Sequence, residues 1–282
     1  MKIDYICVGM QRAGTTWLYK NFQENEKLRG FPFKEIHYFD NNISSSPNYK
    51  KSFFQRIIHR KSILRMIKGI HFFVYSKKCD FNWLTNLIFS DYDDKFYKKL
   101  FDVDIPIKGD LTPSYSMLNI SEIKRMYNLA PDAKIIYIIR NPIDRAWSAL
   151  IKNKKNISNY NEKDLIKFLS SSSSFKRSDA ISTINNYLMV YPKKQFKVFF
   201  FDDLENNPKK MLGDIYEFLG ININCEKVLT KKINNYNKPE IPKNVLIFLK
   251  KKYRNIMHEL SVKYGGYCKE WYKKYYFFEE YP

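Results

Sequence analysis

The sequence has few cysteines and no long apolar stretch. Its four cysteines lie far apart and form no CxxC pair, so neither a zinc site nor a dense disulfide framework is indicated. The most apolar inner stretch, residues 57–75, is interrupted by basic side chains and falls short of the roughly 18 apolar residues of a membrane span. The N-terminus lacks the apolar segment and cleavage site of a secretory signal. We therefore expect a reduced, cytoplasmic protein without a membrane span.

Acidic residues are scarce relative to basic ones. The chain has 49 Lys and Arg against 29 Asp and Glu, a formal net charge of +20. Such an excess favours an anionic partner, such as nucleic acid, acidic lipid, a polyanionic sugar or a phosphorylated cofactor. A second interpretation is coding bias, because 39 of the basic residues are Lys and only 10 are Arg, beside 31 Ile, 25 Asn and 6 Ala. The positions of the charges must decide between the two.

Alternating strand and helix signals predict an α/β protein. Residues 134–139 are almost entirely β-branched and apolar, which is typical of a strand covered on both faces. Strands are also predicted at residues 3–9, 107–110 and 196–201. Helices are predicted from residue 15 and at residues 121–129 (capped by Ser121), 142–150, 162–171, 178–191, 208–219 and 242–264. We expect a P-loop-like three-layer fold in which helices flank a central, mostly parallel sheet.

One region departs from this alternation. Residues 41–48 are rich in Ser and Asn and predict a loop, and the segment from about 50 to 100 is basic, aromatic and helical in pattern. A chain of 282 residues fits one large domain. We therefore predict a single domain over residues 1–282, with a helical insertion or lid at about 44–104.

The first strand leads into a glycine-containing loop at residues 9–16. A helix N-terminus after a strand is where α/β proteins bind phosphate, since its free amides and its dipole both favour an anion. The spacing from Gly9 to Gly14 is that of a Walker A loop, but Thr15 stands where an NTPase has Lys. The basic residue is Arg12, inside the loop. The loop thus predicts a site for a shorter anion, with a plain glycine turn as the alternative.

A second basic turn follows the strand at residues 134–139. Arg140 leaves the carboxyl end of that strand, and Asn141 and Pro142 have the pattern of an N-cap followed by Pro at the first helical position. Ser148 lies eight residues after Arg140, about two helical turns. Arg140 and the Ser148 hydroxyl could therefore converge on one phosphate. The alternative is a solvated Arg with an incidental Ser.

These two segments resemble those of sulfotransferases that use 3′-phosphoadenosine 5′-phosphosulfate (PAPS). Residues 11–18 resemble the 5′-phosphosulfate loop, and residues 140–148 match the 3′-phosphate motif Arg-x-Pro-x-x-Arg-x-x-Ser, including Arg145. Residues 34–39, 109–115 and 200–220 resemble segments of heparan-type and bacterial carbohydrate sulfotransferases, in family order. The resemblance implies that PAPS binds and PAP is the product, with no metal required. The implied nucleotide-binding residues are Arg12, Ala13, Gly14, Thr15, Thr16, Trp17, Arg140 and Ser148.

The resemblance also implies a reaction. A sulfuryl group passes from PAPS by in-line displacement to a hydroxyl or amine of an acceptor, for which a carbohydrate is favoured. Glu35 is the leading general base and His37 the competing one, while Arg12 and Lys34 supply positive charge near the leaving phosphate. Arg145 is a further candidate for the nucleotide side. The late glycine-rich cofactor loop of the family is not recognisable, and we hypothesise that residues 230–238 replace it, with Lys231 and Lys238.

Two other functions stay open on the sequence. One is a P-loop nucleotide kinase, disfavoured because Lys is missing after Gly14 and because Asp4 begins its strand rather than ending it as a magnesium ligand would. The other is a polyanion-binding protein on an inactive sulfotransferase fold. Nucleic acid is not an expected partner, because the informative positive charges are the few at strand ends.

Overall fold

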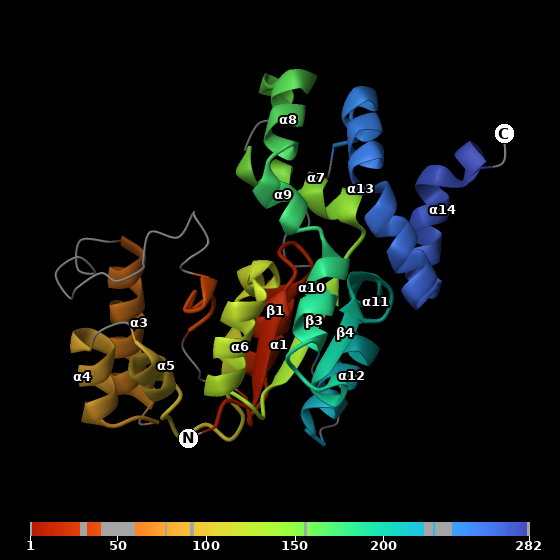
Figure 1. Cartoon of the computed structure of the whole chain (residues 1–282). Coiled ribbons are helices and arrows are strands. Elements are labelled where there is room, and N and C mark those ends of the chain that lie inside the picture. Colours follow the sequence, from red (N-terminus) through yellow and green to blue (C-terminus); the bar gives the residue numbers. More distant parts are fainter. Residues whose placement is uncertain are drawn as a thin grey trace.

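The computed structural model describes residues 2–28, 33–40, 60–76, 78–90, 93–154, 157–222, 228 and 239–280. At its centre is a four-stranded sheet with the order β2-β1-β3-β4 and all pairings parallel. The strands are β1 (Tyr5–Gly9), β2 (Gly109–Leu111), β3 (Lys134–Ile139) and β4 (Phe196–Phe200). Helices lie on both faces of this sheet (Figure 1). The expected α/β class with a parallel, helix-flanked sheet is confirmed.

The central strands are buried because helices cover both of their faces. Every residue of β1 is buried, and so is every residue of β3 after Lys134. In register, Ile6 of β1 lies between Asp110 of β2 and Ile135 of β3. A β-carbon on Gly109 would lie 2.1 Å from the carbonyl oxygen of Tyr5. Glycine at this position therefore allows β2 to pair closely with β1.

Several helices that alternate with the strands begin and end at clear signals. They are α1 (Thr15–Glu24), α6 (Ile120–Leu129), α7 (Pro142–Asn153), α10 (Ala180–Leu188) and α12 (Pro208–Leu219). The predicted cap of α7 is confirmed, since the Asn141 side chain accepts from the amides of Ile143 and Asp144. The predicted cap of α6 is wrong. Asn119, not Ser121, accepts from the Glu122 amide, because the helix begins one residue earlier than its apolar pattern.

Within the residues that the structure describes, the sequence prediction missed three helices, all of them short or aromatic. They are α9 (Ser172–Lys176), α11 (Phe201–Asn206) and α14 (Gly266–Glu280). With α8 (Glu162–Leu169), α13 (Lys243–Tyr264) and the 3₁₀ turns η2 (Pro113–Met117), η3 (Ile157–Asn159) and η4 (Lys193–Gln195), they complete the main domain. In Figure 1 α7, α8, α9 and part of α13 lie above the upper ends of the strands. These helices thus surround the end of the sheet where β1 and β3 terminate.

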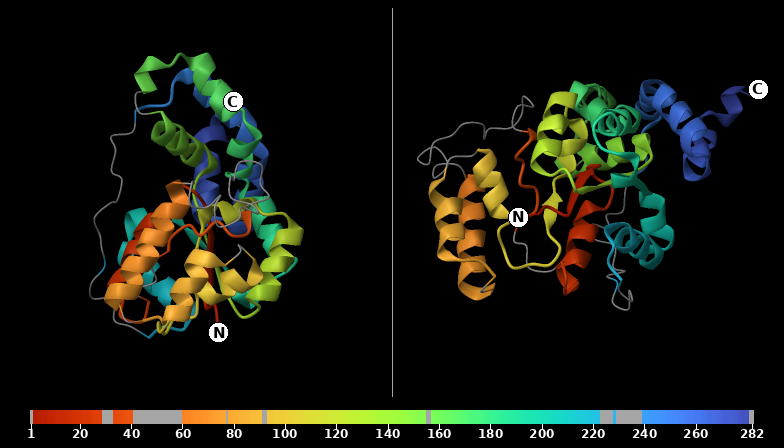
Figure 2. Two further views of the ribbon diagram at one scale, coloured as in Figure 1. Left: turned by 90° about the vertical axis from the view of Figure 1, so that its left-hand side faces the viewer. Right: turned by 60° about the horizontal axis from the view of Figure 1, so that its bottom comes forward.

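The described part of the region predicted as an insertion contains three helices on the β2 side of the sheet (Figure 2). They are α3 (Arg60–Ser76), α4 (Phe81–Phe89) and α5 (Asp94–Leu100). The hydroxyl of Tyr97 in α5 donates to Asp110 of β2 at 3.2 Å, so this group is attached to the sheet. The loop predicted at 41–48 lies outside the described residues. A lid function for this region stays a prediction.

The strand order determines where a ligand would lie. From β1 the chain crosses to β2 on one side, and then returns to β3 on the other side of β1. Open α/β sheets bind ligands at the carboxyl ends of the strands where such a reversal occurs. The two predicted anion-binding segments follow β1 and β3, the strands between which this reversal occurs. No helix in the described part of the chain is long and apolar enough to cross a membrane.

Candidate active site

The loop between β1 and α1 leaves the start of α1 without a side-chain cap. Arg12 and Gly14 have left-handed backbone with φ of 71° and 85°. Gly14 has no side chain with which to cap α1, so an external anion can accept from the amides of the first helical turn. A β-carbon on Gly14 would lie 2.5 Å from Cδ2 of Leu204. Glycine thus serves both the backbone conformation and the close packing of this loop.

The second basic turn contacts the first loop directly. The Arg140 guanidinium donates through NH1 to the carbonyl oxygen of Arg12 at 2.8 Å and lies 4.2 Å from the centre of the Phe201 ring. Arg12 in turn donates from Nε to Ser148 Oγ at 3.1 Å. Arg140 and Ser148 are both buried. Arg12 is 128 positions from Arg140 and 136 positions from Ser148 in the sequence. The three residues nevertheless meet at the carboxyl ends of β1 and β3.

Lys34 connects this region to a carboxylate. Its Nζ donates to Thr16 Oγ1 in the first turn of α1 at 2.9 Å and to Glu35 Oε1 at 3.1 Å. The backbone amide of Glu35 donates to the carbonyl oxygen of Leu111, which holds the segment against the end of β2. Lys34 is thus positioned between the anion-binding loop and Glu35.

Glu35, His37 and Asp40 form a charged chain. His37 Nδ1 lies 2.7 Å from Asp40 Oδ2, and His37 Nε2 forms an ion pair with Glu35 Oε2 at 3.7 Å. Ser114 Oγ donates to the same Asp40 oxygen and lies 3.1 Å from His37 Nδ1. Glu35 and His37 both have positive φ, 60° and 57°. This uncommon backbone conformation brings the two side chains together, and such strain often accompanies functional sites.

The two titratable groups shift each other's pKa. Burial alone would lower the pKa of His37, but its hydrogen bond to Asp40 and its contact with Glu35 outweigh burial and raise the pKa to about 9. The imidazolium of His37, helped by the charge of Lys34, lowers the pKa of Glu35 to about 2. At neutral pH the site therefore contains a protonated His37 beside an ionised Glu35.

The segment after β2 supports this chain. Asp110 is fully buried and accepts from Thr112 Oγ1 at 2.6 Å and from the Tyr115 hydroxyl at 2.7 Å. Burial raises the pKa of Asp110 to about 6. The Tyr115 hydroxyl also accepts from the backbone amide of Tyr38 at 2.9 Å. The 109–115 segment thus fixes the backbone that carries His37, and its own Ser114 contacts that residue.

Arg145 does not lie where the sequence suggested. Its side chain is completely buried and points from α7 toward α9, where Nε donates to Ser178 Oγ and NH2 donates to the carbonyl oxygen of Ser174 at 3.3 Å. Burial lowers its pKa to about 10. Arg145 and Ser148 are three residues apart and so lie on the same face of α7, but the long Arg145 side chain extends to Ser174 and Ser178 rather than to the anion-binding loop. Arg145 therefore holds α7 against the segment that contains these two serines.

The structure brings most of the predicted site residues together. Arg12, Lys34, Glu35, His37, Arg140 and Ser148 form one connected set, with Ala13, Gly14, Thr15, Thr16 and Trp17 in the loop and first turn beside them. The sequence did not single out Asp40 and Ser114. Each adjoins or belongs to a segment noted for its resemblance, which is the signal that could have indicated them. Lys231 and Lys238 lie outside the described residues.

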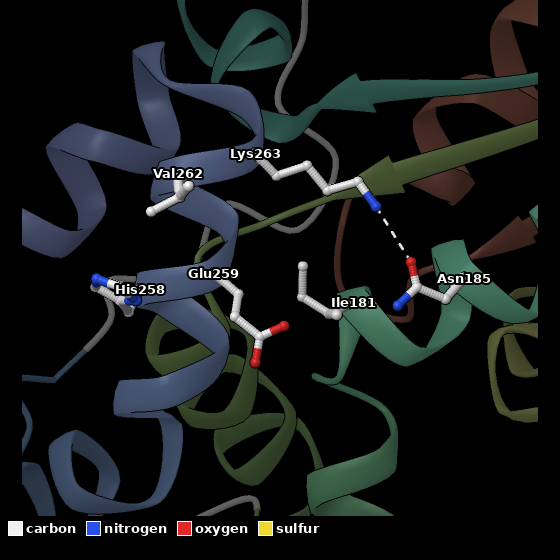
Figure 3. A pocket seen from close by; sticks show the side chains of 6 residues that line it. All are labelled: Ile181, Asn185, His258, Glu259, Val262 and Lys263. Carbon is white, nitrogen blue, oxygen red and sulfur yellow. Dashed lines mark hydrogen bonds between the residues drawn. The ribbon is translucent and has the colours of Figure 1, made fainter.

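A separate hollow of about 290 Å³ lies between α10 and α13 (Figure 3). Lys263 Nζ donates to Asn185 Oδ1 across it at 3.1 Å. None of its lining residues belongs to the connected set. They are Ile181, Asn185, His258, Glu259, Val262 and Lys263. The hollow is not part of the candidate active site.

Comparison with known families decides the class of this site. The model of the sulfotransferase domain family matches residues 2–274. The chain belongs to the sulfotransferase family. The enzyme expected from the two anion-binding segments, a PAPS-dependent sulfotransferase, is thereby confirmed at the level of the family. No curated protein matches the sequence significantly.

Solved sulfotransferase structures share the fold. The sulfotransferase from Alicyclobacillus acidocaldarius is 20% identical, with a TM-score of 0.62 over 96% of this chain and 99% of that chain. The sulfotransferase domain from the curacin biosynthetic pathway is 14% identical, with a TM-score of 0.50 over 79% of this chain and 76% of that chain. At these identities the likeness concerns the fold.

The hydrogen-bond donors of the site fit the PAPS nucleotide. The amides at the start of α1, Arg12 and Lys34 suit a 5′-phosphosulfate, whereas Arg140 and Ser148 suit a second phosphate. Among the described residues, no cluster of three or more His, Cys, Asp and Glu side chains is arranged to hold a metal ion.

Proposed function

We propose that this sulfotransferase transfers the sulfuryl group of PAPS to a hydroxyl group of a carbohydrate, with Glu35 as the general base. The observation that carries the proposal is the bridge formed by Lys34, which contacts both Thr16 at the anion-binding loop and Glu35. One cation thus adjoins the place of the leaving phosphate and the place of the base. The preference for a carbohydrate rests on the resemblance of residues 34–39 and 109–115 to carbohydrate sulfotransferases.

Sulfuryl transfer requires little covalent chemistry from the protein. The acceptor oxygen attacks sulfur in line with the leaving phosphate oxygen, so positioning and electrostatic stabilisation supply most of the catalysis. Arg12 and the amides of α1 neutralise the charge that develops on the 5′-phosphate. Lys34 adds a compact ammonium that can also give up a proton to the leaving oxygen, which Arg12 does poorly because of its very high pKa.

The protonation states favour Glu35 over His37 as the base. A base must be unprotonated, and His37, with a pKa of about 9, carries a proton at neutral pH. Glu35 is ionised, and its side chain is 45% exposed, so an acceptor can reach it. His37 then acts as a positioning residue that orients the Glu35 carboxylate through the 3.7 Å ion pair.

A pKa of about 2 makes Glu35 a weak base before the nucleotide binds. Lys34 contributes to that low pKa. When the ammonium of Lys34 turns from Glu35 toward a bound phosphosulfate, the pKa of Glu35 rises, because an opposite charge leaves and anionic charge arrives. Glu35 would therefore become a stronger base only after PAPS has bound.

The test is labelled-sulfate transfer from PAPS to a panel of carbohydrates, combined with calorimetric binding of PAP. Glu35→Gln should lower turnover by about 10²–10⁴-fold with PAP affinity retained, whereas the exposed control Glu26→Gln should change neither. The assignment of the base is wrong if Glu35→Gln keeps full turnover while His37→Ala loses it. Binding of ATP with magnesium in preference to PAP would contradict the proposed donor.

A further inference from the structure

The backbone conformation that brings Glu35 and His37 together has to be held by its surroundings. Both residues have positive φ although neither is glycine, and such strained conformations persist only where the rest of the structure fixes them. Two attachments come from the main domain. The amide of Glu35 donates to the carbonyl oxygen of Leu111, and the amide of Tyr38 donates to the Tyr115 hydroxyl. Both of these attachments are to backbone groups of the segment.

A third attachment reaches the same segment through the side chain of Tyr38. Its hydroxyl donates to Asp94 Oδ1 at 2.5 Å and accepts from Arg125 NH2 at 2.5 Å. Arg125 also donates to Asp94 Oδ1, from NH2 at 2.6 Å and from Nε at 3.2 Å. The guanidinium carbon of Arg125 lies 4.8 Å from the centre of the buried Tyr38 ring. We call these three residues the Tyr38 clamp; it begins at the residue directly after His37.

The Tyr38 clamp joins the active-site segment to two helices. Asp94 is the first residue of α5, and Arg125 belongs to α6. Tyr97, in the first turn of α5, stacks on the Tyr38 ring with the ring centres 4.5 Å apart, and its hydroxyl donates to Asp110 of β2. Helix α5 therefore contacts both the sheet and the residue next to His37. The region predicted as an insertion is connected to the active site through this helix.

The exposure of the Asp94–Arg125 pair favours a role in geometry over a role in stability. The Asp94 side chain is 49% exposed and that of Arg125 is 30% exposed, and ion pairs between such groups contribute little to stability. Burial would raise the pKa of Asp94, but the hydrogen bonds from Tyr38 and Arg125 outweigh it and lower that pKa. Charge-assisted hydrogen bonds of this kind are directional. They fix the Tyr38 hydroxyl, and with it the end of the strained segment.

We propose that Asp94 and Arg125 are positioning residues, which act through the Tyr38 hydroxyl to hold Glu35 and His37 in the arrangement needed for sulfuryl transfer. Without the Tyr38 clamp the strained segment relaxes, and the Glu35 carboxylate moves from its place beside His37. A displacement of about 1 Å at a reacting group can lower a rate by about 100-fold. The inference rests on the proposed function, because it concerns the residues that hold the proposed base.

The experiment compares Asp94→Ala and Tyr38→Phe with the wild type in two measurements. Labelled-sulfate transfer from PAPS to the carbohydrate panel should show kcat lowered by about tenfold or more, with little change in the KM for PAPS. NMR titration should show the pKa of His37 falling from about 9 toward 6.5 in both variants. The pKa falls because the contacts with Asp40 and Glu35 that raise it become longer. Lower stability alone changes neither quantity in the folded protein.

Asp93→Ala is the matched control. Asp93 precedes Asp94 and caps α5 by accepting from the Phe96 amide, so its loss weakens the same helix but leaves the carboxylate that Tyr38 contacts. We expect it to lower stability and to leave both kcat and the pKa of His37 unchanged. The double variant of Tyr38→Phe with Asp94→Ala should lose no more activity than the weaker of the two single variants, because both changes remove one interaction.

The outcomes separate this inference from the function on which it rests. The inference is wrong if the pKa of His37 in both variants equals the wild-type value, if Asp93→Ala reproduces their effects, or if the two single losses add in the double variant. If Glu35→Gln keeps full turnover, or if no carbohydrate accepts sulfate, the proposed base or the proposed acceptor fails. The pKa of His37 still decides in that case whether the Tyr38 clamp positions this segment.

Discussion

The charge on His37 is the property of this site that pH can test most directly. Its pKa is raised from 6.5 to about 9 by Asp40 and Glu35. A raised pKa in the folded state means that the folded protein binds this proton more tightly than the unfolded chain. The resulting stability is fully present below pH 6.5 and is lost as the pH rises toward 9. The experiment therefore compares the wild-type protein with the His37→Gln variant at a series of pH values from 6 to 10.

The size of the effect follows from the shift. At about 1.4 kcal/mol per pH unit, a pKa raised from 6.5 to about 9 corresponds to an upper limit of about 3 kcal/mol. The His37 side chain is 25% exposed and its partner Glu35 is 45% exposed. Solvent screening at such partly exposed groups reduces the interaction. We therefore expect the free energy of unfolding of the wild type to exceed that of His37→Gln by about 1–2 kcal/mol more near pH 6 than near pH 10.

The assay is urea denaturation of both proteins at each pH, because the difference between them cancels the titration of other groups. The control is His258→Gln, in which an exposed histidine of α13 is removed. NMR titration of the ring protons measures the pKa directly, and the chain has only four histidines to assign. A stability difference that stays constant from pH 6 to 10, or a measured His37 pKa near 6.5, would refute the electrostatic reasoning and reopen His37 as a base.

Three further changes test the donor side of the site. Arg140→Lys removes the hydrogen bond to the Arg12 carbonyl and the planar contact with Phe201; calorimetry should show PAP affinity lowered by about 10–100-fold, with little change in melting temperature. Gly14→Ala places a β-carbon at a φ of 85° and close to Leu204, and should cost about 1–2 kcal/mol in denaturation together with weaker PAP binding. Asn141→Ala removes the cap of α7, and should lower stability by about 1 kcal/mol; an unchanged denaturation midpoint would contradict the role of the cap.

Local signals made much of the fold predictable. The strand at Lys134–Ile139 and the helix at Pro208–Leu219 have the predicted bounds, because an apolar β-branched run and a Pro-to-Gly helix pattern each determine their own ends. The missed helices lack such signals. Helix α9 has only five residues, three of them Ser, and α14 follows α13 after a single glycine, Gly265. In both cases tertiary contacts, rather than propensity, stabilise the helix.

The nucleotide-binding part of the site was predictable for a related reason. Its residues follow two strand ends, and in a parallel sheet those ends meet at one edge. The two basic segments were therefore expected near one nucleotide, although the contact between Arg12 and Ser148 across 136 positions was not itself predicted. Arg145 shows the limit of this reasoning. A motif gives the residue types and their spacing, but what each side chain of α7 contacts depends on what packs around the helix.

The side of the site around His37 depends on contacts that no spacing reveals. Asp40 and Ser114 are 74 positions apart in the chain, and nothing in their spacing pairs them. They meet because the Tyr115 hydroxyl holds the backbone of Tyr38, which brings Asp40 to the hydroxyl of Ser114. Helix α7 shows the same dependence on tertiary contacts, since Ser148 accepts from Arg12 of the anion-binding loop while Arg145, three residues earlier, donates to Ser174 and Ser178. A change at Arg145 that leaves the protein folded should therefore lower PAP affinity, measured by calorimetry, less than Arg140→Lys does, although both arginines belong to the motif that resembles a nucleotide-binding one.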